Sequence, residues 1–332
     1  MEKKYQRKIV SVLKILSDAE KPLGGTRIAQ RLEEYGFDLS QRMVRNYLQR
    51  MDREGLTKNL GKRGRIITPR GEEELKSSFV FEKVGFVASK IDSLTYQMSF
   101  SPRKRTGKII LNLSAISTND IHRAIHNIEL VFRAGLGMGR FVALNVPLDD
   151  RDTGDEDKVA IGTVCSVTIN GIFLSEGIHT TSRFGGLLEL VKGHPVRFTD
   201  IINYDGSSID PLEIFVKGGM TSVGQAVLTG NGKIGASFRE VPSVALSKVE
   251  KIKKRLQVMG LGGILMIGKP GRPLLEIPVS EGRVGMIVAG GLNPLAAVEE
   301  SGISTENVAM KALFEFEDLI PFWELNSAVR KA

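Results

Sequence analysis

The segment from residue 40 to residue 56 constrains the fold most, because its side chains divide between two faces of a helix. At about 100° per residue, one face carries Val44, Tyr47, Leu48 and Met51. The opposite face carries Gln41, Arg42, Arg45, Asn46, Gln49 and Arg53. Ser40 can cap the first turn, since its hydroxyl can accept from an unpaired N–H, and Gly55 suits the left-handed residue that follows a helix. The pattern predicts a helix at 40–54 with one packed face and one cationic, hydrogen-bonding face.

The positive charge of the chain is concentrated in its first 76 residues. They hold 18 Lys and Arg against 11 Asp and Glu, a net charge of +7, whereas the other 256 residues hold 28 against 27, a net charge of +1. A local excess of this kind favours a polyanionic partner over a general role in solubility.

Short elements on either side of the 40–54 helix predict a small domain, residues 1–77. Apolar spacing predicts a first helix over residues 4–17 and a second that begins at Gly25 or Thr26. After the third helix, residues 56–60 and 65–68 indicate two short strands, joined by the basic turn Gly61-Lys62-Arg63-Gly64. This order of elements resembles the winged-helix form of the helix-turn-helix fold across residues 5–75.

In winged-helix proteins the third helix enters the major groove and the wing lies along the backbone or in the minor groove. Because Arg can pair with guanine and Gln with adenine through two hydrogen bonds, the resemblance implies four residues that read base edges: Gln41, Arg42, Arg45 and Gln49. It also implies three phosphate contacts: Lys62, Arg63 and Arg65. The alternative is a small helical module for protein contact whose charges are only solvated.

The remaining residues, 78–332, predict a larger mixed domain. Apolar runs of four to eight residues alternate with helical segments, which indicates an α+β or α/β class. The predicted strands are VGFVAS, KIILNLS, FVALNVP, VAIGTVCSVTI, EIFVKGG, QAVLT, GILMIG and RVGMIVAG. No run approaches the roughly 18 apolar residues of a membrane span, and the N-terminus lacks the pattern of a signal peptide. We therefore expect a cytoplasmic protein with no membrane partner.

Two halves of the larger domain resemble each other. Thr106–Ile109 and Gly135–Gly137 are echoed by Asn231–Ile234 and Gly260–Gly262, each after 125 residues (232−107 and 260−135). A further pair, Gly162-Thr163-Val164 and Gly282-Arg283-Val284, lies 120 residues apart. These echoes predict an internal duplication whose halves meet near residue 206, with a ligand cleft between them.

The motifs that could carry catalysis are incomplete. Gly135-Leu-Gly-Met-Gly139 follows a predicted helix and precedes a strand, the reverse of a phosphate-binding loop, which favours a tight turn. His122 and His126 lie four residues apart, but Arg123 stands where the zinc-protease motif has Glu. No Ser-His-Asp grouping or GxSxG elbow is present. We expect no catalytic residue, no metal site, no cofactor and no enzyme activity.

The most concentrated polar stretch of the larger domain is Gly177–Gly186, which precedes the helical pattern LLELVKG. Arg183 offers a forked guanidinium to a carboxylate, and the glycines let backbone N–H groups approach an anion at a helix N-terminus. The candidate ligand-binding residues are His179, Thr180, Thr181, Ser182, Arg183, Gly185 and Gly186. The alternative is a glycine-rich loop whose arginine pairs with a surface acid.

Cys165 is the only cysteine, which excludes an internal disulfide and any CxxC motif. It lies in the apolar run VAIGTVCSVTI, where a small buried residue is the default interpretation and a residue lining a pocket is the alternative.

Longer stretches of the larger domain resemble one family. The runs GTVCSVTING, GIHTTSRFGGLLEL, IINYDGSSIDPLEIFVKGGMTSV and GRVGMIVAGGLNPLAAVEESGI are similar to the regulatory domain of NrpR, the archaeal repressor of nitrogen-assimilation genes. The resemblance spans residues 80–325, and the winged helix in front of it fits. It implies a repressor that leaves its operator when 2-oxoglutarate binds, and it adds Cys165 to the ligand-binding residues.

The resemblance also implies partners. The expected partners are an operator with inverted repeats, 2-oxoglutarate, and further copies of this chain in a dimer or higher oligomer. Members with one regulatory domain, as here, can act with a companion NrpR protein that lacks the winged helix, and a PII-type protein is a further candidate. Two alternatives stay open: a small-carboxylate enzyme fused to a winged helix, and a regulatory adaptor that does not bind DNA.

Overall fold

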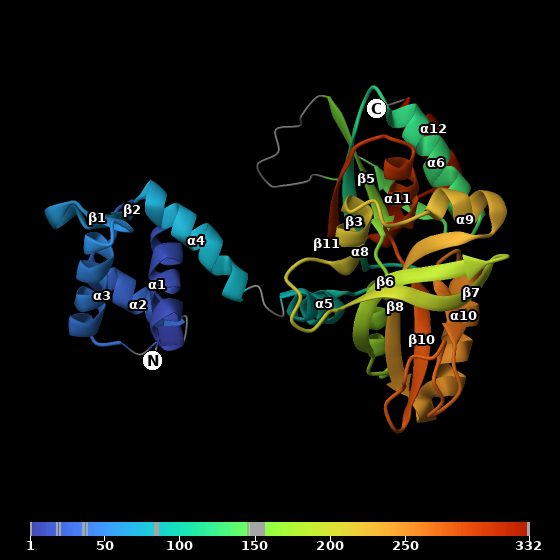
Figure 1. Ribbon diagram of the computed structural model, residues 1–332, viewed down its shortest axis with the longest axis horizontal. Coiled ribbons are helices and arrows are strands. Elements are labelled where there is room, and N and C mark those ends of the chain that lie inside the picture. The colour runs from blue at the N-terminus through green and yellow to red at the C-terminus, as the bar shows by residue number, and fades with distance from the viewer. Residues whose placement is uncertain are drawn as a thin grey trace. The chain divides into compact units, whose positions relative to one another are not determined.

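The computed structural model describes residues 2–17, 19, 21–34, 37, 39–82, 86–144, 146 and 157–330. The chain forms two compact units, residues 1–84 and 85–332 (Figure 1). The boundary predicted after residue 77 falls inside helix α4 (Pro69–Glu82). The first unit therefore continues to the end of that helix.

The first unit has the predicted three helices followed by a hairpin. Its elements are α1 (Glu2–Ser17), α2 (Gly25–Glu34), α3 (Gln41–Arg53), β1 (Thr57–Asn59), the 3-10 turn η1 (Gly61–Arg63), β2 (Arg65–Ile67) and α4. The hydroxyl of Ser40 accepts from the N–H of Met43 at the start of α3 (3.4 Å), and Gly55 after its end has φ of 74°. Strands β1 and β2 pair antiparallel, with Thr57 opposite Ile67. The predicted winged-helix fold is confirmed.

The second unit begins with α5 (Phe86–Gln97) and then repeats one order of elements twice. The first half contains β3 (Lys108–Ser117), α6 (Ile121–Arg133), β4 (Phe141–Leu144), β5 (Lys158–Val164), α7 (Thr168–Ser175), β6 (Thr181–Val191) and β7 (His194–Asn203). After α8 (Pro211–Lys217) and α9 (Val223–Thr229), the second half contains β8 (Gly232–Pro242), α10 (Leu246–Met259), β9 (Ile264–Ile267), β10 (Arg283–Ala289), α11 (Asn293–Glu300) and β11 (Thr305–Glu315). The C-terminal elements are β12 (Ile320–Pro321) and α12 (Leu325–Val329).

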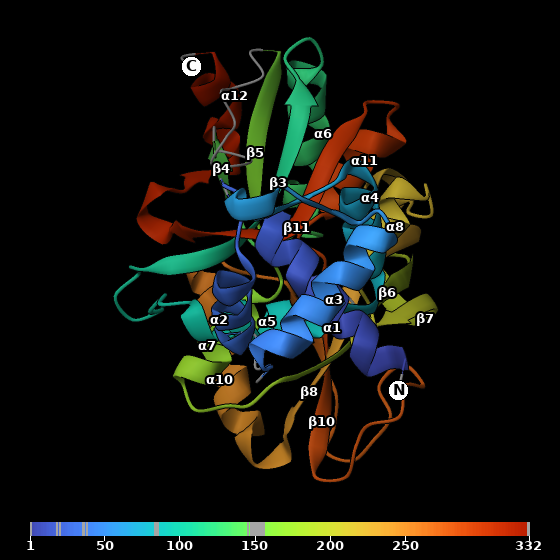
Figure 2. The ribbon, with the colours of Figure 1, turned by 90° about the vertical axis from the view of Figure 1, so that its left-hand side faces the viewer.

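The strands form two antiparallel sheets that share the two halves of the unit. One sheet has the order β11-β3-β5-β4-β12 and the other β7-β6-β8-β10-β9. Both views show β3 beside β5 and β8 beside β10 (Figures 1 and 2). Strand β6 of the first half pairs with β8 of the second, and β11 of the second pairs with β3 of the first. The first half thus contributes β6 and β7 to the sheet of the second half, and the second half contributes β11 to the sheet of the first.

The predicted duplication is present in the order of elements and in the hydrogen bonds. Strands β5 and β10 begin 125 residues apart (283−158), as do helices α7 and α11 (293−168). The side chain of Thr168 binds the backbone of Ile110, and that of Asn293 binds the backbone of Gly235, both across 58 residues. The third sequence match is wrong in register, because Gly162 lies within β5 whereas Gly282 precedes β10.

Several short apolar runs adopt the other secondary structure. EIFVKGG and QAVLT, predicted as strands, lie in helices α8 and α9, and VGFVAS enters helix α5, with residues 84–85 outside the described part. LLELVKG, predicted as a helix, completes strand β6. A buried apolar run of about seven residues fits a helix or a strand equally well, so the elements it packs against determine which of the two it forms.

Candidate DNA-binding surface and ligand cavity

Helix α3 presents the predicted face to solvent. Val44, Leu48 and Met51 are fully buried on the inner side. The four predicted base-reading residues are all exposed on the outer side: Gln41, Arg42, Arg45 and Gln49. Hydrogen-bonding forks and positive charge therefore project from a rigid helix, the arrangement that suits base edges in a major groove.

Two of the three hairpin residues predicted to contact phosphate are exposed to solvent. Lys62 and Arg63 lie at the exposed tip. Arg65 differs, because its side chain is only 13% exposed and its Nε donates to Asp52 of α3 at 3.0 Å. Asp52 also accepts from the hydroxyl of Thr57 at 2.6 Å. Arg65 therefore anchors the hairpin to α3, and a phosphate contact would have to compete with that ion pair.

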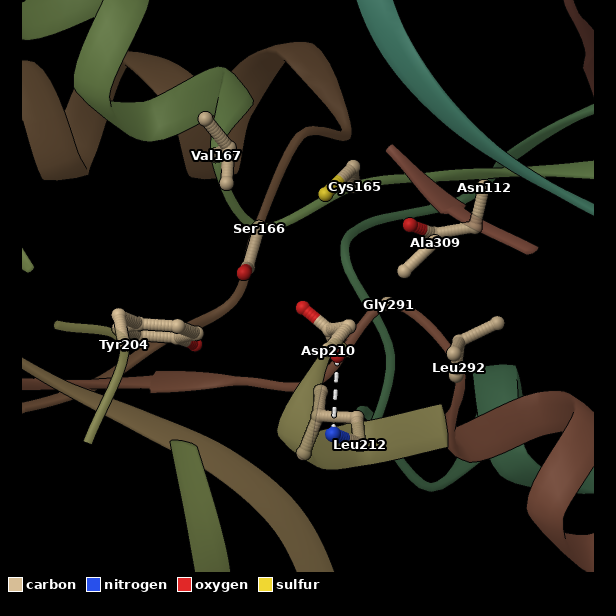
Figure 3. Close-up of a pocket in the computed structure, with 10 residues that line it drawn as sticks. All are labelled: Asn112, Cys165, Ser166, Val167, Tyr204, Asp210, Leu212, Gly291, Leu292 and Ala309. Carbon is tan, nitrogen blue, oxygen red and sulfur yellow. Dashed lines mark hydrogen bonds between the residues drawn. The ribbon is translucent and has the colours of Figure 1, made fainter. Parts of the chain in front are cut away.

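A narrow cavity lies between the two halves of the second unit (Figure 3). The first half contributes Asn112, Cys165, Ser166 and Val167, the connection between the halves contributes Tyr204, Asp210 and Leu212, and the second half contributes Gly291, Leu292 and Ala309. The free volume at its centre is about 10 Å³. That is room for about one water molecule, so a larger occupant requires the walls to separate.

Two equivalent turns form facing walls of this cavity. The turn at Cys165 leads from β5 into α7, and the turn at Gly290 leads from β10 into α11. The N–H of Cys165 donates to the carbonyl of Ile110, and that of Gly290 to Gly235, both at 2.8 Å and across 55 residues. A Cβ on Gly291 would lie 2.3 Å from the carbonyl oxygen of Val164, so only glycine lets the turns approach this closely. Two helix N-termini, each with a partial positive charge, therefore meet at the cavity.

A buried arginine stands behind one of these walls. Arg239 of β8 is 0% exposed. Its Nη1 donates to the Ser166 carbonyl (2.7 Å) and to Asn170 Oδ1 (2.6 Å), and its Nη2 donates to the Ser166 hydroxyl (2.7 Å). Its Nε has no hydrogen-bond partner among the described residues. These partners are neutral, so the charge of Arg239 adds to the positive potential at the turn.

Burial makes two acidic groups of the cavity wall easier to protonate than they are in water. Burial raises the pKa of Asp210 to about 6, and the N–H of Leu212, which the carboxylate accepts at 2.9 Å, acts in the opposite direction. Burial also raises the pKa of the Cys165 thiol to about 12, so this thiol is not a nucleophile at neutral pH. The cavity therefore combines the positive potential of the two helix N-termini and Arg239 with a neutral thiol and with an Asp210 carboxyl group that ionises as the pH rises through about 6.

The same chain matches known regulators. Residues 84–320 match the family described as NrpR regulatory domains NRD1 and 2. A protein of Methanosarcina mazei named global nitrogen regulator NrpRI is 32% identical over 323 residues, which are 96% of this chain and 99% of that protein. The chain belongs to the NrpR family. As a member of this family of regulators it is not an enzyme, as predicted.

Other relatives agree with this assignment. Proteins named global nitrogen regulator NrpR from Methanococcus maripaludis and Methanocaldococcus jannaschii are each 31% identical, and this chain spans 54% of the length of each. The crystal structure of a nitrogen repressor-like protein from Methanococcus jannaschii matches 71% of this chain and 98% of that one, at 30% identity and a TM-score of 0.61. Residues 10–75 match the family described as the ribonuclease R winged-helix domain.

The ligand-binding residues predicted for this NrpR-family chain do not come together. Of the eight, Cys165 lies on the cavity wall. The others follow the loop before β6 and the strand itself: His179, Thr180, Thr181, Ser182, Arg183, Gly185 and Gly186. Arg183 pairs with the buried carboxylate of Glu240, and the hydroxyl of Ser182 accepts from Asn170. The predicted loop with a following helix is wrong. Of the alternative, the arginine paired with an acid is present, but the arginine lies in a strand and the acid is buried and not on the surface.

The two glycines of β6 serve packing. A Cβ on Gly185 would lie 2.8 Å from Pro211, and one on Gly186 would lie 2.6 Å from the carbonyl oxygen of Asp200. The other motifs are structural: Gly135–Gly139 forms the expected turn, and His122 and His126 are exposed on α6. Within the described ranges there is no cluster of metal-ligating side chains and no helix long and apolar enough to span a membrane.

Sequence reasoning missed most of the cavity wall and Arg239. A usable signal was the 125-residue repeat, because it aligns Cys165 with Gly290. The contributions of Tyr204 and Asp210 had no local signal, since both lie in the connection between the halves.

The raised pKa of Asp210 predicts a pH-dependent stability. Because its folded-state pKa of about 6 lies above the ordinary value of 3.8, the folded protein holds this proton more tightly than the unfolded chain. Protonated Asp210 therefore contributes to the free energy of unfolding, on the order of 2–3 kcal/mol. This contribution is fully present below pH 4 and is lost as the pH rises through 6. Asp210→Asn keeps the helix cap. We expect its free energy of unfolding in urea to exceed that of the parent at pH 7.5 and to equal it at pH 4.

Asp205→Asn, an exposed position in the same connection, is the matched control and should follow the parent at both pH values. An equal shift in both variants, or none in Asp210→Asn, would show that this carboxyl does not set the pH dependence.

Proposed function

We propose that this NrpR-family chain is a DNA-binding transcriptional repressor of nitrogen-assimilation genes, released from its operator by 2-oxoglutarate. The observation that carries the proposal is the cavity, where two helix N-termini and the buried Arg239 create a positive potential in a chain that also presents the cationic face of α3. The names of the relatives support the role in nitrogen regulation.

A dicarboxylate suits this cavity by charge but exceeds its free volume of about 10 Å³. The ligand must therefore bind better to a form in which the halves have separated. A ligand shifts a conformational equilibrium only by its differential affinity for the two forms, and a change from mostly bound to mostly free operator needs about 5 kcal/mol in total. In an oligomer, this differential binding free energy can be divided among the ligand sites of the several copies of the chain.

The proposed oligomer is based on the way in which winged helices bind operator DNA. A single winged helix covers one half-site, so we propose a dimer or higher oligomer on an inverted repeat with half-sites about one helical turn apart. A companion NrpR protein without a winged helix and a PII-type protein are further proposed partners. We place the chain in the cytoplasm, where this operator would lie.

The test uses the full chain. A duplex is selected from random-sequence DNA with the chain, and its dissociation constant is measured by gel shift without ligand and with 2-oxoglutarate, with glutarate as the control that lacks the keto group. We expect 2-oxoglutarate to weaken binding at least tenfold and glutarate to have a smaller effect. If the chain binds 2-oxoglutarate tightly but selects no DNA duplex, it acts as the adaptor. If NMR shows that the chain consumes 2-oxoglutarate, it is an enzyme.

A further inference from the structure

Helix α5 is the first element of the second unit and follows the DNA-binding unit directly. Helix α4 of the first unit ends at Glu82, and α5 begins at Phe86. Three residues of chain therefore join the two helices. A change in the position of α5 changes the point at which the first unit is attached.

Two hydrogen bonds tie α5 to the segments that wall the cavity. Lys90 Nζ donates to the carbonyl of Ala309, which lines the cavity, at 3.1 Å. The N–H of Val87 donates to the carbonyl of Ser207 at 3.2 Å. Ser207 lies between Tyr204 and Asp210, both of which also line the cavity.

The apolar side of α5 packs behind the same wall. Val87 and Ile91 are 2% and 3% exposed. They belong to one buried cluster with the cavity residues Cys165, Val167 and Tyr204. Movement of these three side chains therefore moves the surface on which α5 rests, because a close-packed interior transmits displacement.

The segment that Lys90 holds is an irregular part of β11. Its pairing with β3 shifts register between Val308 and Ala312, and Met310 has a positive φ of 52°. The N–H of Met310 donates to Asn112 Oδ1 at 3.1 Å, and the N–H of Ala309 donates to the carboxylate of Glu213. A left-handed non-glycine residue persists only where its surroundings hold it, and here side chains on the cavity side hold it.

The charges around Lys90 agree with this arrangement. Burial raises the pKa of Asp210 and of Glu213, and the ammonium group of Lys90 acts in the opposite direction on both. Lys90 of α5 thus lies near the carboxylate of Asp210, which lines the cavity, and near that of Glu213, and it donates to the carbonyl of Ala309. An anion that entered the cavity would add negative charge beside the Asp210 carboxylate.

We propose that α5 is the element that couples the cavity to the DNA-binding unit, with the Lys90–Ala309 contact holding the DNA-binding form. This inference rests on the proposed function and specifies its regulation. Separation of the cavity walls by the ligand displaces the Ala309 segment, breaks the contact with Lys90 and frees α5. The attachment of the first unit then changes, and the operator is released.

The coupling is tested with Lys90→Met in the full chain, which keeps the aliphatic stem and removes the ammonium group. Loss of the contact favours the released form, so we expect half-release of the selected duplex at a 2-oxoglutarate concentration about 3- to 10-fold lower than in the parent. Lys90→Arg, which keeps a cation, should stay close to the parent. Lys251→Met, at an exposed position of α10, is the control for loss of a lysine charge.

The sign of the effect separates two roles for Lys90. If Lys90 bound the ligand itself, Lys90→Met would need more 2-oxoglutarate for release, which would overturn the proposal, as would a result equal to that of Lys251→Met. A parent chain that binds DNA and ignores 2-oxoglutarate contradicts the proposed function, and the coupling with it. A parent that responds normally, with an unchanged Lys90→Met, contradicts the coupling alone.

A second measurement does not depend on any variant. In hydrogen exchange of the parent chain, saturating 2-oxoglutarate should accelerate exchange at the amides of α5 and of residues 305–313, and should leave α10 unchanged. Unchanged protection of α5 in a chain that releases its operator would overturn the proposal.

Discussion

Arg239→Met should lower the free energy of unfolding by about 2–4 kcal/mol and weaken 2-oxoglutarate binding at least tenfold. The substitution leaves the Ser166 carbonyl and Asn170 Oδ1, both buried, without the donor that now binds them. Each such loss costs about 1–3 kcal/mol. It also removes the fixed positive charge behind the Ser166 wall. Urea unfolding followed by the fluorescence of Trp323, the only tryptophan, measures stability, and calorimetry measures ligand affinity.

Two further variants make this result interpretable. Arg197→Met removes an arginine of β7 whose side chain is 65% exposed, and it should change stability by less than about 0.5 kcal/mol. Arg239→Lys keeps the positive charge but loses the planar guanidinium group that binds Ser166 and Asn170. We therefore expect losses of stability and of ligand affinity between those of the parent and of Arg239→Met. A buried charge without a role can be replaced by an apolar side chain at no loss. An Arg239→Met chain as stable as the parent, with full ligand affinity, would therefore remove Arg239 from the site.

Arg42→Ala and Arg45→Ala should each weaken operator binding by about 1–3 kcal/mol, which is roughly 5- to 150-fold, and should relax the base preference at one position each. Both side chains project from the exposed face of α3, opposite its buried residues. Gel shifts on the selected duplex and on single-base variants of it measure affinity and preference.

Arg50→Ala is the matched control on the same helix, because the Arg50 Nε is bound to Glu54 at 2.7 Å. It should retain the base preference of the parent. Equal losses in all three variants, with unchanged preference, would show that α3 contributes only general electrostatic attraction. Lys62→Ala at the tip of the hairpin should instead flatten the salt dependence of binding.

The Arg65–Asp52 ion pair refines this picture of the DNA-binding surface. By sequence, Arg65 belongs with Lys62 and Arg63 in one basic hairpin, and charge alone does not distinguish them. The structure does, because Asp52 of α3 lies opposite the base of the hairpin and not its tip. The distinction is between an arginine that orients the hairpin and two side chains that are free to reach a phosphate.

The sequence by itself determined the features that depend on neighbouring residues. The period of Val44, Leu48 and Met51, the cap at Ser40 and the charge of Lys62 and Arg63 are local properties, and they were enough to predict the winged helix and its outer face. The 125-residue repeat was also readable, since duplicated halves keep their glycines at the same turns.

Only the tertiary structure decided the ligand cavity. Because each half contributes strands to the sheet of the other, the cavity is walled by residues as distant in the sequence as Asn112 and Ala309. That exchange also places β6 beside β8, which binds Arg183 to Glu240. The polar pattern of residues 177–186 predicted neither the pairing of β6 with β8 nor the ion pair between Arg183 and Glu240. Burial of Arg239 and the raised pKa of Asp210 arise in the same way, because desolvation depends on what the completed fold packs around a charge.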